Sequence, residues 1–70
     1  MASTEFKYVE NEGLPYALSI ARGSSFFMRG KSREDWAELE SMTTGKMRDN
    51  GSPISEAQAL DMASELSVPN

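Results

Sequence analysis

The chain has 70 residues, a net charge of −4 and neither cysteine nor histidine. This length supports one small domain, and the missing residue types exclude disulfides, thiolate metal sites and histidine-based catalysis. No apolar run reaches the length of a membrane span, and the first residues lack the basic and apolar pattern of a signal peptide. We therefore predict a cytoplasmic protein with no membrane partner, folded as one domain over residues 1–70 with 1–3 and 67–70 frayed.

The first half of the chain has the pattern of antiparallel strands. Apolar and polar residues alternate over 4–10 and 15–22, and Asn11-Glu12-Gly13 between them is typical of a turn. A third strand is predicted at 26–30, after a turn that contains Gly23. These segments predict a three-stranded antiparallel meander.

Phe26 and Phe27 are adjacent, so in a strand they must point to opposite faces of the sheet. One of them joins the predicted core, and the other needs a different environment. We expect it to lie under a helix, on a partner or half exposed.

Two helix starts follow the strands. Ser32 precedes Glu34 and Asp35, which suit the first turn of a helix, and this predicts a helix over 32–47. Ser55 and Gln58 have the spacing of a capping box, which predicts a second helix over 55–66.

The predicted fold class is therefore α+β, with both helices packed on one face of the meander. A stripe of large apolar side chains is expected to bury that face. Its members are Trp36, Leu39, Leu60 and Leu66.

The charges are segregated along the sequence. Residues 22–33 contain four basic residues and no acid, whereas residues 34–70 contain eight acids and two bases. This distribution favours two surfaces of opposite sign, a basic hairpin and an acidic helix.

No motif predicts an enzyme. The carboxylates between 34 and 40 have the pattern of a solvated helix face, and the turn at 49–52 lacks the ligand spacing of a calcium loop. Gly30-Lys31-Ser32 resembles the end of a phosphate-binding loop, but its upstream glycine is absent because residue 25 is serine. We predict no catalytic residue, metal site or cofactor.

The leading hypothesis is a non-enzymatic protein that binds and inhibits a larger macromolecule, of the kind that phages or mobile elements encode. One alternative is a nucleic-acid-binding module that uses the basic hairpin over 22–33, since cations and aromatics are mixed there. Another is a homodimeric, antitoxin-like regulator, because a thin core and open sheet edges favour further burial.

The candidate partner-binding residues come from both charged segments. Either the basic hairpin or the acidic helix face would be the working surface. The candidates are Arg22, Phe26, Phe27, Arg29, Lys31, Arg33, Glu34 and Glu38.

Overall fold

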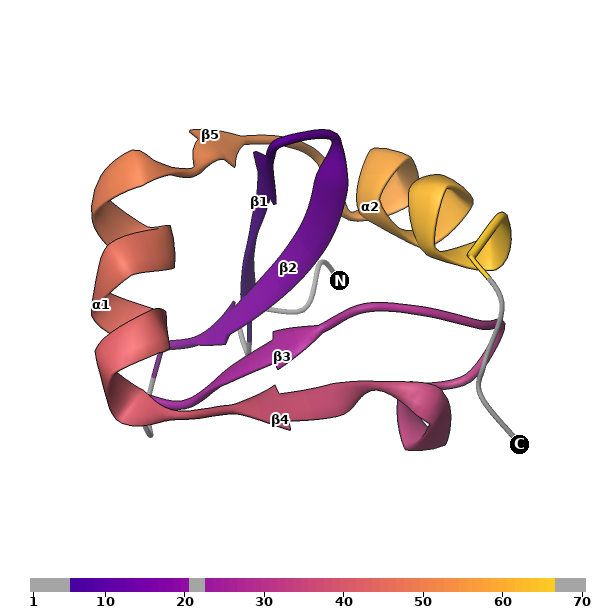
Figure 1. Cartoon of the computed structure of the whole chain (residues 1–70). Coiled ribbons are helices and arrows are strands. Elements are labelled where there is room, and N and C mark those ends of the chain that lie inside the picture. Colours follow the sequence, from indigo (N-terminus) through magenta and orange to yellow (C-terminus); the bar gives the residue numbers. More distant parts are fainter. Residues whose placement is uncertain (1–5, 21–22, 67–70) are drawn as a thin grey trace.

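The computed structural model describes residues 6–20 and 23–66, which form a five-stranded antiparallel sheet and two α-helices (Figure 1). The α+β class is thus confirmed. Among these residues, no helix combines the length and the apolar composition that crossing a bilayer requires. In chain order the elements are β1 (Phe6–Asn11), β2 (Leu14–Ser19), β3 (Ser25–Phe27), the 3₁₀ turn η1 (Arg33–Asp35), β4 (Ala37–Leu39), α1 (Ser41–Asn50), β5 (Ser52–Pro53) and α2 (Glu56–Ser64).

The strands lie in the order β4-β3-β2-β1-β5, and each neighbouring pair is antiparallel. The first four strands follow one another as a meander, and β5 then returns to the free edge of β1 (Figure 1). The prediction of three strands was therefore too small, because β4 and β5 extend the sheet at its two edges. The predicted strand at 26–30 is also shorter in the structure, since β3 ends at Phe27.

The hairpin between β1 and β2 has the geometry that its sequence predicts. Glu12 and Gly13 both have positive φ angles, 55° and 79°, as a two-residue hairpin turn requires. The Glu10 carboxylate accepts a hydrogen bond of 2.6 Å from the Gly13 amide, which holds the non-glycine residue in this conformation. Local sequence chemistry therefore fixes the register of the first two strands.

The two helices cover opposite faces of the sheet, which corrects the prediction that both lie on one face. Alternate residues of β1 are buried on each side, with Tyr8 in the core beneath α2 and Val9 only 1% exposed against the end of α1. Figure 1 shows α1 and α2 at opposite sides of the twisted strands. Phe26 and Phe27 point to opposite faces as predicted, and Phe27 packs against Tyr16 on the α1 side. Burial, and then the charge of Glu12, raise the pKa of Tyr16.

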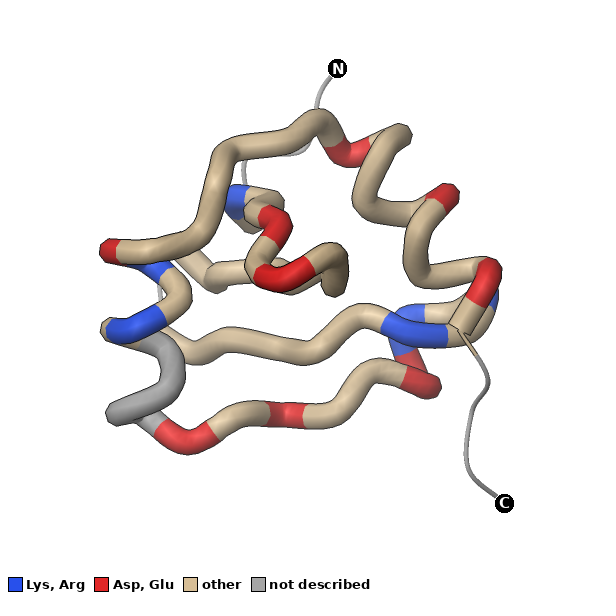
Figure 2. Tube along the Cα trace, turned by 45° about the horizontal axis from the view of Figure 1, so that its top comes forward, with Lys and Arg blue, Asp and Glu red and all other residues tan. Residues whose placement is uncertain are grey.

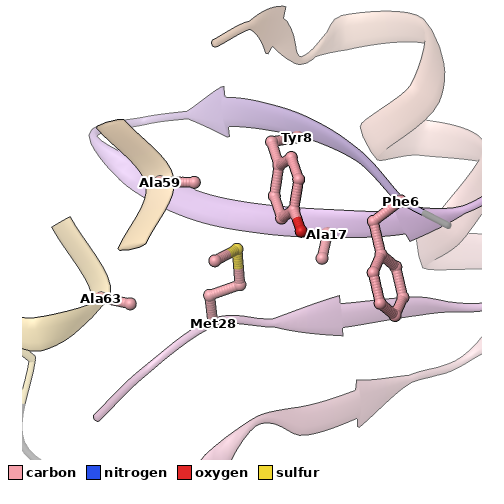
Figure 3. Packing of buried hydrophobic residues seen from close by; sticks show 6 residues of the cluster. All are labelled: Phe6, Tyr8, Ala17, Met28, Ala59 and Ala63. Atoms are coloured by element: carbon pink, nitrogen blue, oxygen red, sulfur yellow. The ribbon is translucent and has the colours of Figure 1, made fainter. Parts of the chain in front are cut away.

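Helix α2 begins with the predicted capping box. The Ser55 hydroxyl accepts a bond from the Gln58 amide at 3.1 Å, and the Gln58 side chain accepts one from the Ser55 amide at the same distance. Four residues apart, Ala59 and Ala63 then face the sheet and are fully buried, with Met28 between them and β2 (Figure 3).

The buried stripe of α2 differs from the predicted one. Leu60 is 47% exposed, because the helix turns its alanines rather than its large side chains toward the sheet. Small side chains allow a closer approach of helix and sheet, and Met28 fills the remaining space. Of the predicted apolar stripe, Trp36, Leu39 and Leu66 are half-buried.

The predicted helix over 32–47 is present only in its last part, which belongs to α1, and the prediction is wrong for residues 32–40. Ser32 does cap a turn, since its hydroxyl accepts a bond from the Glu34 amide at 3.2 Å, but the turn ends at Asp35. The chain then extends as β4, in which Glu38 pairs with Phe26, and α1 begins only at Ser41. Strand pairing with β3 thus outweighs the local helix preference of this segment.

Helix α1 ends at Asn50, and a close approach requires a glycine at the next position, Gly51. A Cβ atom at position 51 would lie 2.6 Å from the Met47 carbonyl oxygen and 2.8 Å from Cγ2 of Val9. The backbone after α1 therefore touches the side chain of β1 directly.

We predict that Gly51→Ala lowers the free energy of unfolding by about 1–3 kcal/mol, because the added methyl group clashes with backbone and a fully buried valine. Gly45→Ala is the matched control, since a Cβ there meets only an Arg48 side-chain nitrogen at 3.9 Å. Within a helix this control should stabilise by about 0.5–1 kcal/mol. Urea unfolding followed by circular dichroism measures both, and equal stability of Gly51→Ala and wild type would contradict the contact.

A second prediction concerns α2. Ser55→Ala should cost about 1 kcal/mol through loss of the cap, whereas Leu60→Ala should cost less than about 1 kcal/mol because its side chain is half exposed. The same unfolding experiment ranks the two variants. A larger loss for Leu60→Ala would mean that Leu60 is a core residue.

Candidate functional site

Three aromatic rings meet on the α2 face of the sheet, beyond the end that α2 covers. The centroid of the Phe6 ring lies 5.9 Å from that of Phe26 and 5.7 Å from that of Trp36, and both pairs are edge-to-face. Phe26 and Trp36 are 6.2 Å apart. We call Phe6, Phe26 and Trp36 the aromatic cluster.

The strand register explains how rings from β1 and β3 come together across β2. Ser19 stands opposite Phe6 and Ala17 stands opposite Phe26, so β2 presents only small side chains between the two rings. Phe6 and Phe26 can therefore touch above the middle strand. Trp36 reaches them from the segment between η1 and β4.

Arg33 on η1 lies over this cluster. Its guanidinium carbon is 4.8 Å from the Phe6 ring centroid and 5.8 Å from the Trp36 ring centroid, within the range of cation–π attraction. Nε of Arg29 donates a 2.6 Å hydrogen bond to the Asp35 carbonyl oxygen and so ties the end of β3 to η1. Arg29 thus helps to hold the turn that positions Arg33.

Two hollows flank Trp36. The first has a volume of about 280 Å³, and its walls are almost wholly apolar. The second has a volume of about 210 Å³ and borders the last turns of α2. Arg33 and Trp36 belong to both. The first is lined by Phe6, Phe26, Arg33, Glu34 and Trp36. The second is lined by Gly30, Lys31, Ser32, Arg33, Trp36, Leu60 and Ser64.

Both hollows are smaller than the usual small-molecule site, which measures about 300–1,000 Å³. Their size suits single side chains of a partner. Aromatic residues and arginine are also the residue types enriched at the energetic centres of protein interfaces.

The structure gathers some of the predicted site residues and separates others. Phe26, Arg33 and Glu34 line the first hollow, and Lys31 lines the second. Phe27 is turned to the opposite face, where its ring centroid is 5.6 Å from that of Tyr16.

The remaining predicted site residues are Arg29, Glu38 and Arg22. Arg29 and Lys31 follow β3 in a loop, rather than extending along it. Glu38 pairs with Phe26 across β3 and β4. Arg22 lies outside the described residues.

The predicted acidic helix face does not exist. Glu34, Glu38 and Glu40 lie on η1, on β4 and before α1, because the helix that would have aligned them is not formed. Figure 2 shows acidic positions spaced along this edge of the sheet. It also shows basic positions close beside acidic ones at the η1 end, so the charge segregation of the sequence is not retained as two separate surfaces there.

Sequence analysis did not find Phe6, Trp36 or Leu60 as site residues. The sequence pattern predicts Trp36 and Leu60 as core residues. A signal for Trp36 was present, since it follows Arg33, Glu34 and Asp35 in a strongly charged run. A large aromatic in such a run is a candidate for a half-exposed anchor.

Comparisons with protein-family models, with curated proteins and with solved structures gave no match to this chain. Its function therefore has to be argued from the geometry of the site.

We predict that Arg33→Ala lowers the free energy of unfolding by about 0.5–1 kcal/mol, because an exposed cation over aromatic rings contributes about that much. Arg48→Ala is the matched control, since this exposed arginine makes a 3.8 Å surface pair with Asp49, which contributes little. Urea unfolding should show no measurable change for the control. Equal effects of the two substitutions would show that the stacking contributes nothing.

Proposed function

We propose that this chain is a non-enzymatic protein that binds and modulates a larger protein through the aromatic cluster and Arg33. The observation that carries the proposal is an apolar hollow of about 280 Å³ with two half-buried aromatic rings and an arginine in its walls. A chain of 70 residues has few large apolar side chains, so each aromatic ring that stays accessible reduces the apolar area buried in the core. Binding to a partner would recover that burial.

The charges around the cluster support a protein partner over a nucleic acid. Glu34 lines the first hollow, and Glu38 is paired with Phe26 in the sheet. Arg33 lies over the Phe6 ring, which is therefore not an open platform for a base.

A homodimer formed through the sheet edge is less well supported. The β4 edge has three residues with Glu38 in the middle, and β5 at the other edge has two residues, one of them Pro53. Two copies paired about Glu38 would place like charges opposite each other. Short, charged or proline-bearing edges of this kind discourage strand pairing.

Small size and an excess of acid also fit an inhibitor, of the kind that phages or mobile elements encode. Such a protein needs no chemistry of its own, since occupying a functional surface of the partner is enough. The aromatic cluster would supply affinity, and the surrounding charges would select the partner.

Affinity capture from a lysate of the native cells, quantified by mass spectrometry, tests the proposal. We expect the wild-type chain to retain a partner that Trp36→Ala and Arg33→Glu each retain at least about tenfold less. Ile20→Ser is the matched control, since Ile20 is 65% exposed but lines a different hollow, with Leu18 and Arg48. It should retain the partner fully.

Circular dichroism must show that each variant is folded before the capture is compared. If Trp36→Ala and Arg33→Glu both still capture the partner, the proposal is refuted. If only Ile20→Ser loses the partner, the binding surface lies on the opposite face of the sheet.

A further inference from the structure

The second hollow differs from the first in its charge. Lys31 and Arg33 are in its walls, and none of the acidic residues within 6–20 and 23–66 lines it. Glu34, by contrast, lines the first hollow. The two hollows share Arg33 and Trp36, so a cationic hollow and an aromatic hollow lie side by side.

Hydrogen bonds hold the cationic hollow in shape. Gly30, with a φ angle of 75°, donates its amide hydrogen to the Ala63 carbonyl oxygen at 2.9 Å and so fixes the loop against the end of α2. The Ser32 hydroxyl oxygen accepts the bond from the Glu34 amide at 3.2 Å, and a serine hydroxyl is both an acceptor and a donor. Lys31 and Arg33 thus lie on either side of Ser32 in a loop that is tied to α2 through Gly30.

Resting on the proposed function, we propose that the partner presents an extended acidic–apolar segment to these two hollows. A carboxylate of that segment enters the second hollow between Lys31 and Arg33. An aromatic or large aliphatic side chain enters the first hollow on the other side of Trp36.

Because the two hollows share Arg33 and Trp36, the two side chains that enter them must lie close together along the segment. Two side chains that enter neighbouring hollows must leave the same side of the bound backbone. In an extended chain, alternate residues point to the same side and are about 7 Å apart. The recognition pattern is therefore an Asp or Glu two positions from a Phe, Trp, Leu or Met.

Charge complementarity favours a carboxylate over a polyphosphate. A single carboxylate matches two cations and one hydroxyl donor, and charge-assisted bonds from arginine to carboxylate are strong and directional. A polyanion would extend past the cationic hollow toward Glu34 and the acidic β4 edge, where it would meet like charge.

The test starts with random 12-residue peptides displayed on phage and selected on the immobilised full chain, with a counter-selection on Trp36→Ala. We expect enrichment of peptides that contain the acidic–apolar pattern. The best peptide is then synthesised, and its affinity is measured by Trp36 fluorescence, since Trp36 is the only tryptophan and belongs to both hollows.

Lys31→Glu and Arg33→Glu should each lower the affinity for this peptide at least about tenfold. Replacing the acidic residue of the peptide by the matching amide should lower the affinity by the same factor. Lys46→Glu is the matched control, because it makes the same charge change at an exposed position of α1. It should leave the affinity within about twofold.

Three outcomes would overturn the inference. The first is that no peptide is selected by the wild-type chain in preference to Trp36→Ala, and the second is that the selected peptides contain no acidic residue. The third is that Lys31→Glu does not weaken peptide binding. If the captured cellular partner is nevertheless lost in Arg33→Glu, the proposed function stands and only the extended segment is wrong. If an oligothymidine displaces the peptide at low salt and its binding weakens steeply when salt is added, the ligand of this site is a single-stranded nucleic acid and not a peptide.

Discussion

The close packing of α2 against the sheet is the constraint on which the rest of the structure depends. Ala17 on β2 and Ala59 and Ala63 on α2 are fully buried, and Met28 fills the space between helix and strand. Because the contact is made by small side chains, the helix lies close to β1 and β2. The large rings of this face therefore collect beyond the helix, where part of their surface stays accessible.

Local chemistry made several features predictable from the sequence. The turn between β1 and β2 follows from an Asn-Glu-Gly run, and the start of α2 follows from the spacing of Ser55 and Gln58. The opposite orientation of Phe26 and Phe27 follows from strand geometry alone. In each case the interaction that decides the structure lies within a few residues of the chain.

The segment 32–40 could not be predicted in the same way, because distant residues decide it. Its capped turn is real, but pairing with β3 and contacts of Trp36 with Phe6 and Phe26 replace the expected helix by a strand. The candidate site was affected in turn. Lys31, Arg33 and Phe26 were predictable site residues, whereas Phe6 and Trp36 come from other segments and join Phe26 only in the folded chain.

The return of β5 to β1 has a consequence for how the chain folds. Strands β1 to β4 join neighbours along the sequence, but α1 must pass from the β4 edge to the β1 edge before Ser52 and Pro53 can pair with Glu10 and Val9 (Figure 1). Closing so long a loop lowers the chain entropy before any stabilising contact has formed, so non-local pairing slows folding. We therefore expect the meander to form first and the β5–α2 segment to dock on it last.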